Sequence, residues 1–593
     1  MGCGTSSLRN KQPEKVVKAA LVIQNWYRGY RARLMARQHY ALAIFQSIEY
    51  ADEQSQMQLS NFFSFMLEHY KHARKEDLVL VNRLRETNLQ DLKDRQSYVE
   101  LVEVPKSYDG PRLQFPLTFT DIDVLLEAFR QQQVLHAHYV LEVLFETKKI
   151  LRKMPNFTHV TTSPSKEITI CGDLHGSLED LLLIFYKNGL PSENNSYIFN
   201  GDFVDRGRNS IETLMVLFVS FLVYPSDLHL NRGNHEDFMM NLRYGFTQEV
   251  LYKYKLHGKQ ILKVLEEVYT WLPIGTIIDD EILIIHGGIS ESTDLNLLHR
   301  LERNKMKTVL MPPMSVNRDQ AVDLKKDKAG KIMASGKATS SNSLSEQLSK
   351  HEWEQVITVF SASDYYEEGS NRGAYIRLAH DMAPRFFQYR ATSASCLSPL
   401  YQRVEVMEYS AIRILKERII ARKTDLIRAF QLRDHSRSGK ISVAQWAFSM
   451  ENILELNLPW RTLSPHLVNI DSDGNVDYMS IFQDVHIVKS LETVKSAVIE
   501  TLYRYRSDLK IIFNIIDSDH SGMISIEEFR AMWKLFSSHY NVCIDNTQLD
   551  ELAHTMDLNR DGSIDFNEFL KTFYIVHKYD KLKTPHNKFA KFK

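Results

Sequence analysis

Four short segments of the chain combine metal-binding types of side chain with glycine. They are Gly172–Gly176, Gly201–Gly207, Arg232–Glu236 and His286–Gly288. Their aspartate, asparagine and histidine side chains offer the mixed oxygen and nitrogen ligands that suit manganese, iron or zinc better than calcium. Two such cations, held about 4 Å apart, stabilise both the attacking and the leaving oxygen of a phosphoryl displacement. The residue types therefore indicate a two-metal site for phosphoryl chemistry.

Each of the four segments follows a short apolar run that is typical of a buried strand. The runs are Glu167–Cys171, Tyr197–Phe199, Leu228–Leu230 and Ile282–Ile285. Helical periodicity marks residues 121–153, and the apolar run 214–224 is too short to span a bilayer and is expected to be a buried helix. Strands that alternate with helices predict an α/β domain with its chemistry at the strand ends. One such loop alone is usually an ordinary turn, so the prediction depends on all four.

Taken in this order, the four segments resemble the motifs of the phosphoprotein phosphatase family of metallophosphoesterases, and the resemblance covers residues 115–395. It implies a metallophosphoesterase-type β-sandwich flanked by helices. It also implies a protein serine/threonine phosphatase in which a hydroxide held by two divalent transition metals (Mn, Fe or Zn) attacks phosphoserine or phosphothreonine. The ligands that it implies are Asp173 and His175 for the first metal, Asp202 between the metals, and Asn234 with His286 for the second.

The same resemblance assigns roles to three further side chains. It implies that His235 protonates the leaving serine or threonine oxygen and that Asp205 keeps this imidazole charged and oriented. Arg206 is expected to bind phosphate oxygens in a bidentate manner. Glycines beside these residues let the backbone approach the metals closely. A single histidine is more often an ordinary core residue, whereas the complete set favours catalysis.

The family pattern breaks after His286. Family members continue with a Trp-Ser-Asp-Pro stretch, a phosphate-binding arginine and an Arg-x-His element whose histidine completes the second metal site, and this chain has none of them. A polar insert at 315–350 is followed by Val356–Tyr366, which resembles a late strand and loop of the family. The sequence therefore predicts a deletion near residue 355, as alternative splicing could produce. Two functions stay open: a calcium-regulated phosphatase, or a catalytically impaired protein that binds calcium, calmodulin and partners.

Residues 411–580 are predicted to form a helical EF-hand domain. The loops 517–528 and 557–568 have a carboxylate at the first position, glycine at the sixth and glutamate at the twelfth, which is the pattern of a Ca²⁺-binding loop. They start 40 residues apart, as expected for a paired lobe that resembles calmodulin-like sensors. The predicted calcium ligands are Asp517, Asp519, Ser521, Met523, Glu528, Asp557, Asn559, Asp561, Ser563 and Glu568.

Two upstream loops depart from this pattern. The loop 434–445 ends in Gln445 instead of a carboxylate, and the loop 469–480 matches less well. Little or no calcium binding is expected without the final bidentate carboxylate. The two loops are predicted to form a partner lobe with a structural role.

Residues 19–46 show helical periodicity with many arginines. A basic amphipathic helix of this kind fits its apolar anchors into a calmodulin groove while its arginines meet the acidic rims. The sequence therefore favours calmodulin as a partner. A solvated basic helix, a membrane-surface helix and docking of the chain's own EF-hand lobe stay open as alternatives. The residues that match an IQ motif are Ile23, Gln24, Arg28, Gly29 and Arg33.

The N-terminal tail, residues 1–18, carries signals for lipid attachment. Gly2 fits the N-myristoylation pattern, and Cys3 offers a thiol for palmitoylation. Two acyl chains hold a protein at a membrane, whereas one binds only marginally. The tail therefore predicts a cytoplasmic protein that is associated with a membrane surface, and an unmodified tail is the alternative.

The composition agrees with a multidomain intracellular protein, in which an α/β domain is followed by an all-α domain. The 593 residues, 44% of them hydrophobic, suffice for several packed domains. The 73 basic and 74 acidic side chains nearly cancel, so no nucleic-acid partner is expected. The four cysteines are scattered, which argues against a disulfide framework or a zinc finger. With a linker at 47–114, the domain order looks like the EF-hand branch of the phosphoprotein phosphatases.

Overall fold

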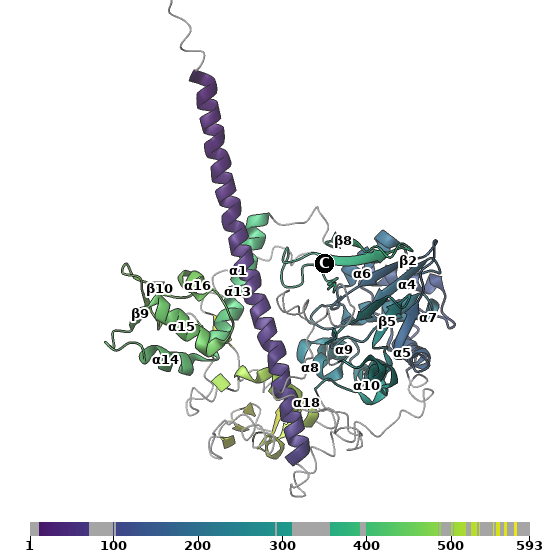
Figure 1. The fold of residues 1–593 in the computed structure, drawn as a ribbon. Coiled ribbons are helices and arrows are strands. Elements are labelled where there is room, and N and C mark those ends of the chain that lie inside the picture. The colour runs from purple at the N-terminus through teal and green to yellow at the C-terminus, as the bar shows by residue number, and fades with distance from the viewer. Residues whose placement is uncertain are drawn as a thin grey trace, which may run out of the picture.

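The computed structural model describes residues 11–69, 102–290, 293–310, 356–391, 399–483 and 485–487, together with Val99 and shorter pieces between residues 500 and 577. The first element that the structure describes is the long helix α1 (Lys11–His69). This helix runs between two globular parts, and its N-terminal end extends beyond both of them (Figure 1). Among the described helices, none combines the length and the apolar character that crossing a bilayer requires.

The first globular part is built on two sheets that pack face to face. One has five strands in the order β4-β3-β2-β7-β8, and the other has three in the order β1-β5-β6. Apolar side chains from both sheets, such as Ile168 and Ile284, form one buried cluster, which makes the predicted β-sandwich. The strands are β1 (Phe157–Val160), β2 (Glu167–Cys171), β3 (Asn195–Phe199), β4 (Leu228–Leu230), β5 (Gly275–Ile278), β6 (Ile282–Ile285), β7 (Gly373–Leu378) and β8 (Arg385–Tyr389).

Helices cover the other face of the five-stranded sheet. Their apolar stripes share one large buried cluster with strand residues such as Tyr197 and Phe199. Helix α7, which contains the predicted apolar run, is buried along nearly its whole length. The helices that contribute to this cluster are α4 (Phe119–Arg130), α5 (Ala137–Leu151), α6 (Leu178–Asn188), α7 (Ser210–Val223), α9 (Phe246–Lys253) and α10 (Gly258–Trp271). The same globular part also contains α8 (Phe238–Tyr244), α11 (Leu295–Arg300) and the short η2 (Arg303–Lys305).

The second globular part contains the EF-hand loops. Short antiparallel pairings join β9 to β11 and β13 to β14, so the structure pairs the loops in the two lobes that the sequence predicts. Its elements are α13 (Leu400–Ile420), α14 (Lys423–Gln431), β9 (Lys440–Ser442), α15 (Val443–Leu454), α16 (Trp460–Leu467), β10 (Asn469–Ile470), β11 (Asn475–Asp477), η4 (Ser480–Phe482), β12 (Val485–Ile487), α18 (Arg506–Ile516), β13 (Met523–Ser525), β14 (Ser563–Asp565) and β15 (Ile575–His577).

The helical periodicity predicted over 121–153 is confirmed, as two helices, α4 and α5, separated by a turn. Two local predictions need correction. Helix α1 continues to His69, so the expected linker 47–114 begins with helix, because Ile48 and Leu59 are buried by packing. In the segment 356–366, only Phe360 forms a bridge, with Asp173, and no strand is present there. The polar insert 315–350 and residue 355 lie outside the described residues.

Candidate metal centre

The four predicted loops meet at one edge of the β-sandwich. Asp173 and His175 follow β2, Asp202 follows β3, and Asn234 follows β4. These three strands are parallel, and their C-terminal ends therefore lie side by side. His286 follows β6 of the other sheet and reaches the same place. Segments that are distant in the sequence thus bring their metal-binding side chains together.

Close approach of these loops depends on glycine and on strained backbone. A Cβ at Gly233 would lie 2.2 Å from Asp202 Oδ1, a separation that real side chains do not reach. Asp202 and Arg206 have φ values of +54° and +67°, which non-glycine residues seldom adopt. Such strain persists only where the surrounding structure enforces it, and it is common at functional sites.

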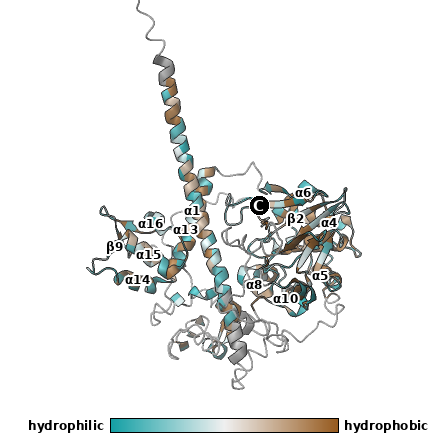
Figure 2. Cartoon of the chain, in the orientation of Figure 1, coloured by the Kyte–Doolittle hydropathy of each residue, from teal (hydrophilic) through white to brown (hydrophobic). Residues whose placement is uncertain are grey.

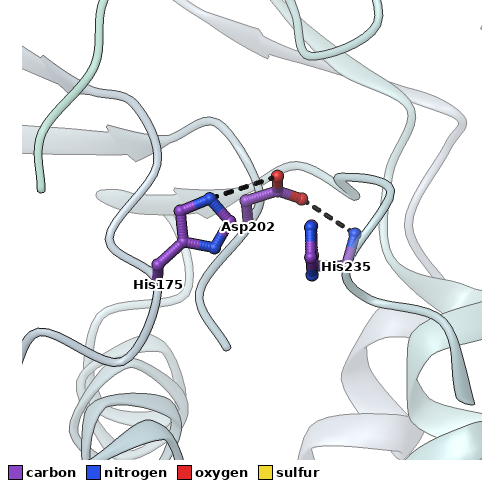
Figure 3. A group of neighbouring side chains, drawn as sticks. All are labelled: His175, Asp202 and His235. Atoms are coloured by element: carbon purple, nitrogen blue, oxygen red, sulfur yellow. Dashed lines mark hydrogen bonds and ion pairs between the residues drawn. The ribbon is translucent and has the colours of Figure 1, made fainter. Parts of the chain in front are cut away.

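Two groups of side chains in these loops are arranged to hold cations, and Asp202 belongs to both. One is His175, Asp202 and His235, and the other is Asp173, Asp202 and His286, with the ligand atoms of each group within 4.8 Å of one another. His175 Nε2 lies 3.9 Å from one carboxylate oxygen of Asp173 and 3.9 Å from one of Asp202. Figure 3 shows Asp202 between His175 and His235. An aspartate shared by two donor sets is the arrangement that a two-metal site needs.

The charges in these groups also fit bound cations. Burial, and then the nearby Asp202, raise the pKa of Asp173 to about 7. Burial lowers the pKa of His175 to about 3, so that imidazole is neutral and can act as a ligand. Burial opposes protonation of His286, but the Asp202 carboxylate outweighs it and raises the pKa of His286 to about 10. A metal ion would take the place of that proton and relieve the repulsion between the carboxylates.

Asn234 and His286 lie together as the predicted second donor set. Asn234 Oδ1 is 2.9 Å from His286 Nε2, which is 3.4 Å from Asp202 Oδ2. His286 Nδ1 lies 2.7 Å from the carbonyl oxygen of Asn200, and this contact aims Nε2 at the carboxylates. Within the described ranges, the group around His286 contains no second histidine. Among the residues that the structure describes, the second donor set therefore has one imidazole fewer than the family pattern implies.

His235 and Asp205 form a buried pair beside the metal-binding groups. His235 Nδ1 lies 2.8 Å from Asp205 Oδ2. The same carboxylate accepts hydrogen bonds from Asn241 Nδ2 at 2.8 Å and from the Phe246 backbone N–H at 2.9 Å. Burial alone would lower the pKa of His235, but the Asp202 and Asp205 carboxylates outweigh it and raise that pKa. The pair is therefore arranged to keep a protonated imidazole at the site.

Sequence reasoning missed Glu236, which joins two of the loops. Its carboxylate is fully buried and accepts hydrogen bonds at 2.8 Å from the backbone N–H groups of Asp202, Phe203 and Gly233. Burial, followed by the charge of Asp202, raises the pKa of Glu236 to about 7. The one signal in the sequence is an acidic residue directly after His235 in a loop that must pack tightly.

Arg206, the predicted phosphate-binding residue, lies beside the metal-binding groups and contacts aromatic rings. Its guanidinium is 4.7 Å from the ring centre of Tyr244 and 5.3 Å from that of Tyr365. One nitrogen lies 2.8 Å from the carboxylate of Glu49 in helix α1. Sequence reasoning could not predict these three partners, because they come from three segments that are distant from Arg206.

The structure describes four of the predicted calcium ligands: Met523, Glu528, Asp557 and Ser563. Strands β13 and β14 pair the two loops, and Asp557 Oδ2 accepts a hydrogen bond from the Gly562 N–H at 3.0 Å, which closes the loop at its sixth position. The other predicted ligands lie outside the described residues: Asp517, Asp519, Ser521, Asn559, Asp561 and Glu568.

The first EF-hand lobe satisfies its acidic groups internally. Asp434 accepts hydrogen bonds from the N–H groups of Gly439 at 2.7 Å and Ser438 at 3.0 Å. Lys440 Nζ pairs with Asp471 at 3.0 Å, so an ammonium group supplies positive charge between the two loops. These contacts favour the predicted structural role.

The predicted IQ residues lie on the projecting part of α1, where Ile23 is 65% exposed and Trp26 is 64% exposed. Arg28 and Arg33 are exposed there, while Gly29 is partly buried and Gln24 is exposed. Figure 2 shows apolar residues on this stretch away from both globular parts. An apolar and basic helix surface is therefore available to a partner. Gly2 and Cys3 lie outside the described residues.

Comparison with protein-family models matches four segments of the chain. A model described as calcineurin-like phosphoesterase matches residues 166–366, and one described as an EF-hand domain pair matches residues 506–574. An IQ calmodulin-binding motif matches residues 17–34, and a PPP5 TPR repeat region matches residues 85–159. The first three matches coincide with the segments that carry the metal-binding loops, the last two calcium loops and the exposed helix.

Curated relatives align with the chain over nearly its whole length. A rat protein named serine/threonine-protein phosphatase with EF-hands 1 is 66% identical, with 99% of this chain and 100% of the relative covered. A human protein named serine/threonine-protein phosphatase with EF-hands 2 is 39% identical, with 98% of this chain and 96% of the relative covered. The Drosophila melanogaster phosphatase rdgC is 36% identical, with 96% and 91% covered.

Proposed function

Because the chain belongs to the family of serine/threonine-protein phosphatases with EF-hands, we propose that it is a metal-dependent, calcium-regulated hydrolase of phosphoserine and phosphothreonine in proteins. The observation that carries this proposal is that the side chains of Asp173, His175, Asn234 and His286 gather around the single carboxylate of Asp202. Two metals in this place would supply Lewis acidity and an activated water. Asp173, His175, Asn234 and His286 would hold them with Asp202, and the mixture of oxygen and nitrogen donors favours manganese, iron or zinc.

The remaining residues of the centre act on the substrate. His235, oriented through Nδ1 by Asp205 at 2.8 Å, has Nε2 available to donate a proton to the leaving serine or threonine oxygen. Arg206 offers several N–H donors to phosphate oxygens from its place between two tyrosine rings. Glu236 holds the loops of Asp202 and Gly233 in register through backbone hydrogen bonds.

A second candidate function is supported by the length of the alignment. The alignment to the rat relative spans 650 positions, whereas this chain has 593 residues, so at least 57 of those positions have no residue of this chain. This difference supports the deletion proposed near residue 355. Loss of a second-metal histidine and of a phosphate-binding arginine would leave a catalytically impaired protein that still binds calcium and calmodulin.

Calcium and calmodulin are the proposed regulators. Filling of the loops 517–528 and 557–568 would open the second lobe, as calcium does in sensor EF-hand pairs. The exposed apolar and basic surface around Ile23 and Trp26 supports calmodulin as the partner of α1. Acylation of Gly2 and Cys3 would then hold a cytoplasmic protein at a membrane surface.

The test of the enzymatic proposal is manganese-dependent hydrolysis of a phosphoserine peptide and of an aryl phosphate by the intact chain. A His235→Asn variant is the control, since asparagine is a smaller polar side chain without an ionisable proton near neutral pH. Hydrolysis that requires metal and falls in the variant supports the phosphatase. Metal binding without hydrolysis of either substrate would favour the impaired binding protein.

A further inference from the structure

An ion pair that the proposed reaction does not use joins helix α1 to the centre. Glu49 of α1 lies 2.8 Å from a guanidinium nitrogen of Arg206, and the two side chains are 11% and 26% exposed. The Glu49 carboxylate also accepts hydrogen bonds from the hydroxyl groups of Tyr365, at 3.0 Å, and Tyr366. A partly buried glutamate is thus bound by one cation and two hydroxyl donors.

This cluster lies at the rim of the metal-binding groups. The ring of Tyr365 is centred 5.2 Å from that of His175, and the ring of Tyr244, on which Arg206 stacks, is centred 4.9 Å from that of His235. Arg206, whose guanidinium contacts both tyrosine rings, therefore lies close to the predicted proton donor and to one of the predicted metal ligands. A substrate phosphate would need the same donors, because guanidinium groups bind carboxylates and phosphates by the same geometry.

From this geometry, and on the basis of the proposed function, we propose that Glu49 is an intramolecular competitor of the substrate phosphate. Its carboxylate occupies the donors of Arg206 and Tyr365, and a phosphoprotein displaces it to bind. The carboxylate carries no phosphorus and offers nothing to hydrolyse, so the contact holds the chain in a state of low affinity for substrate.

Helix α1 is fixed firmly enough to place Glu49 there. One turn before Glu49, Phe45 stacks on Tyr366 with ring centres 4.9 Å apart. Two turns after it, Gln56 Nε2 donates to Tyr244 Oη at 2.7 Å. The contact is therefore held from both sides along the helix.

The same region connects α1 to the calcium-binding half of the chain. Arg243 donates to Ser55 of α1 at 3.0 Å and to Asp508 of α18 at 2.8 Å. Helix α18 leads into the calcium loop 517–528. A change in that lobe thus has a short physical path to the helix that carries Glu49.

The test compares Glu49→Gln with Asp52→Asn in the full-length chain. Asp52 is an α1 carboxylate that pairs with Arg418 of α13 instead of Arg206, so its variant makes the same change of charge on the same helix. Binding of inorganic phosphate is measured by calorimetry, and KM is measured with a phosphoserine peptide. Glu49→Asp, whose shorter side chain also gives up the contact, is the second variant in case Glu49→Gln is poorly folded.

The proposal expects Glu49→Gln and Glu49→Asp to bind phosphate and peptide roughly ten- to a hundredfold more tightly, the effect of removing one charge-assisted competitor, while Asp52→Asn binds like the parent. Unchanged or weaker binding by the Glu49 variants overturns it. An equal gain in Asp52→Asn also overturns it, because loosening of α1 would then explain the effect. Tighter phosphate binding without hydrolysis in any form supports the competitor and rejects only the phosphatase activity.

Discussion

Replacing Asp205 by asparagine gives the sharpest view of proton donation at the centre. The carboxylate accepts three hydrogen bonds, from His235, Asn241 and the Phe246 N–H, at 2.8 to 2.9 Å. Asparagine has one acceptor oxygen and an NH₂ group, so at least one of these donors would face another donor. The variant also removes the negative charge of the carboxylate that lies beside the His235 imidazole. A charge this close typically changes the pKa of the neighbouring group by about 1 to 3, which corresponds to an interaction free energy of about 1.4 to 4 kcal/mol.

The loss should depend on the leaving group. Without a protonated His235, hydrolysis of a phosphoserine peptide should fall by about a hundred- to ten-thousandfold, the usual contribution of a general acid. The kcat/KM for a nitrophenyl phosphate should fall much less, because its leaving group departs without a proton. The assay measures kcat/KM of both substrates with manganese present, for the parent and for Asp205→Asn.

Asp227→Asn is the matched control for this prediction. Asp227 makes the same kind of buried contacts, to Lys166 at 3.1 Å and Ser196 at 3.2 Å, but outside the metal-binding loops. Asp227→Asn should leave the ratio of the kcat/KM values for the two substrates unchanged. If Asp205→Asn lowers the kcat/KM values for both substrates equally, the carboxylate acts through folding or metal affinity. The assignment of His235 as proton donor is then refuted.

Three further substitutions test other parts of the structure. Gly233→Ala places a Cβ 2.2 Å from an aspartate oxygen and should abolish metal-dependent hydrolysis. Gly287→Ala, with no atom within 4 Å of its Cβ, should keep that hydrolysis. An equal loss of hydrolysis in both variants would contradict the argument that the loops need close approach at Gly233. Burial raises the pKa of Glu266 to about 7 from 4.5, so stability that is complete below pH 4.5 is lost as the pH rises through 7. Glu266→Gln should remove this loss, at most about 3 kcal/mol, and thermal unfolding at pH 5 and pH 8 measures it; a parent and variant with the same pH dependence would refute it. Arg243→Met leaves the buried carboxylate of Asp508 unpaired and should lower the free energy of unfolding by about 3–5 kcal/mol. The double variant with Asp508→Leu should recover part of this loss. Chemical denaturation of the single and double variants measures it, and simple additivity of the two single effects would count against an interaction between Arg243 and Asp508.

The metal-binding loops could be predicted from the sequence because their chemistry is local. Each loop keeps its ligands within a few residues of an apolar run, and parallel strands place the ends of such runs at one edge of a sheet. Asp173 and Asp202 therefore lie together as expected, and Asn234 joins them through its contact with His286. The paired EF-hand lobes were predictable for the same reason, since each loop contains its own ligand pattern.

The docking of helix α1 could not be predicted from the sequence. Periodicity shows that a helix exists, but not where its side chains dock, and Glu49 is 157 positions away from Arg206. The same limit explains the early end predicted for this helix, since Leu59 is buried by tertiary packing that the local pattern does not encode. Glu236 was missed because its role is to accept hydrogen bonds from backbone groups, which leave no trace in the residue types.

The most direct test of the centre measures transition-metal content by mass spectrometry in the purified parent and in Asp202→Asn, with Asp227→Asn as the control. The shared position of Asp202 predicts that the parent carries transition metal and that Asp202→Asn loses it from both donor groups, while Asp227→Asn keeps it. A parent without metal, or an Asp202→Asn variant that retains the full content, would contradict the central role of this carboxylate.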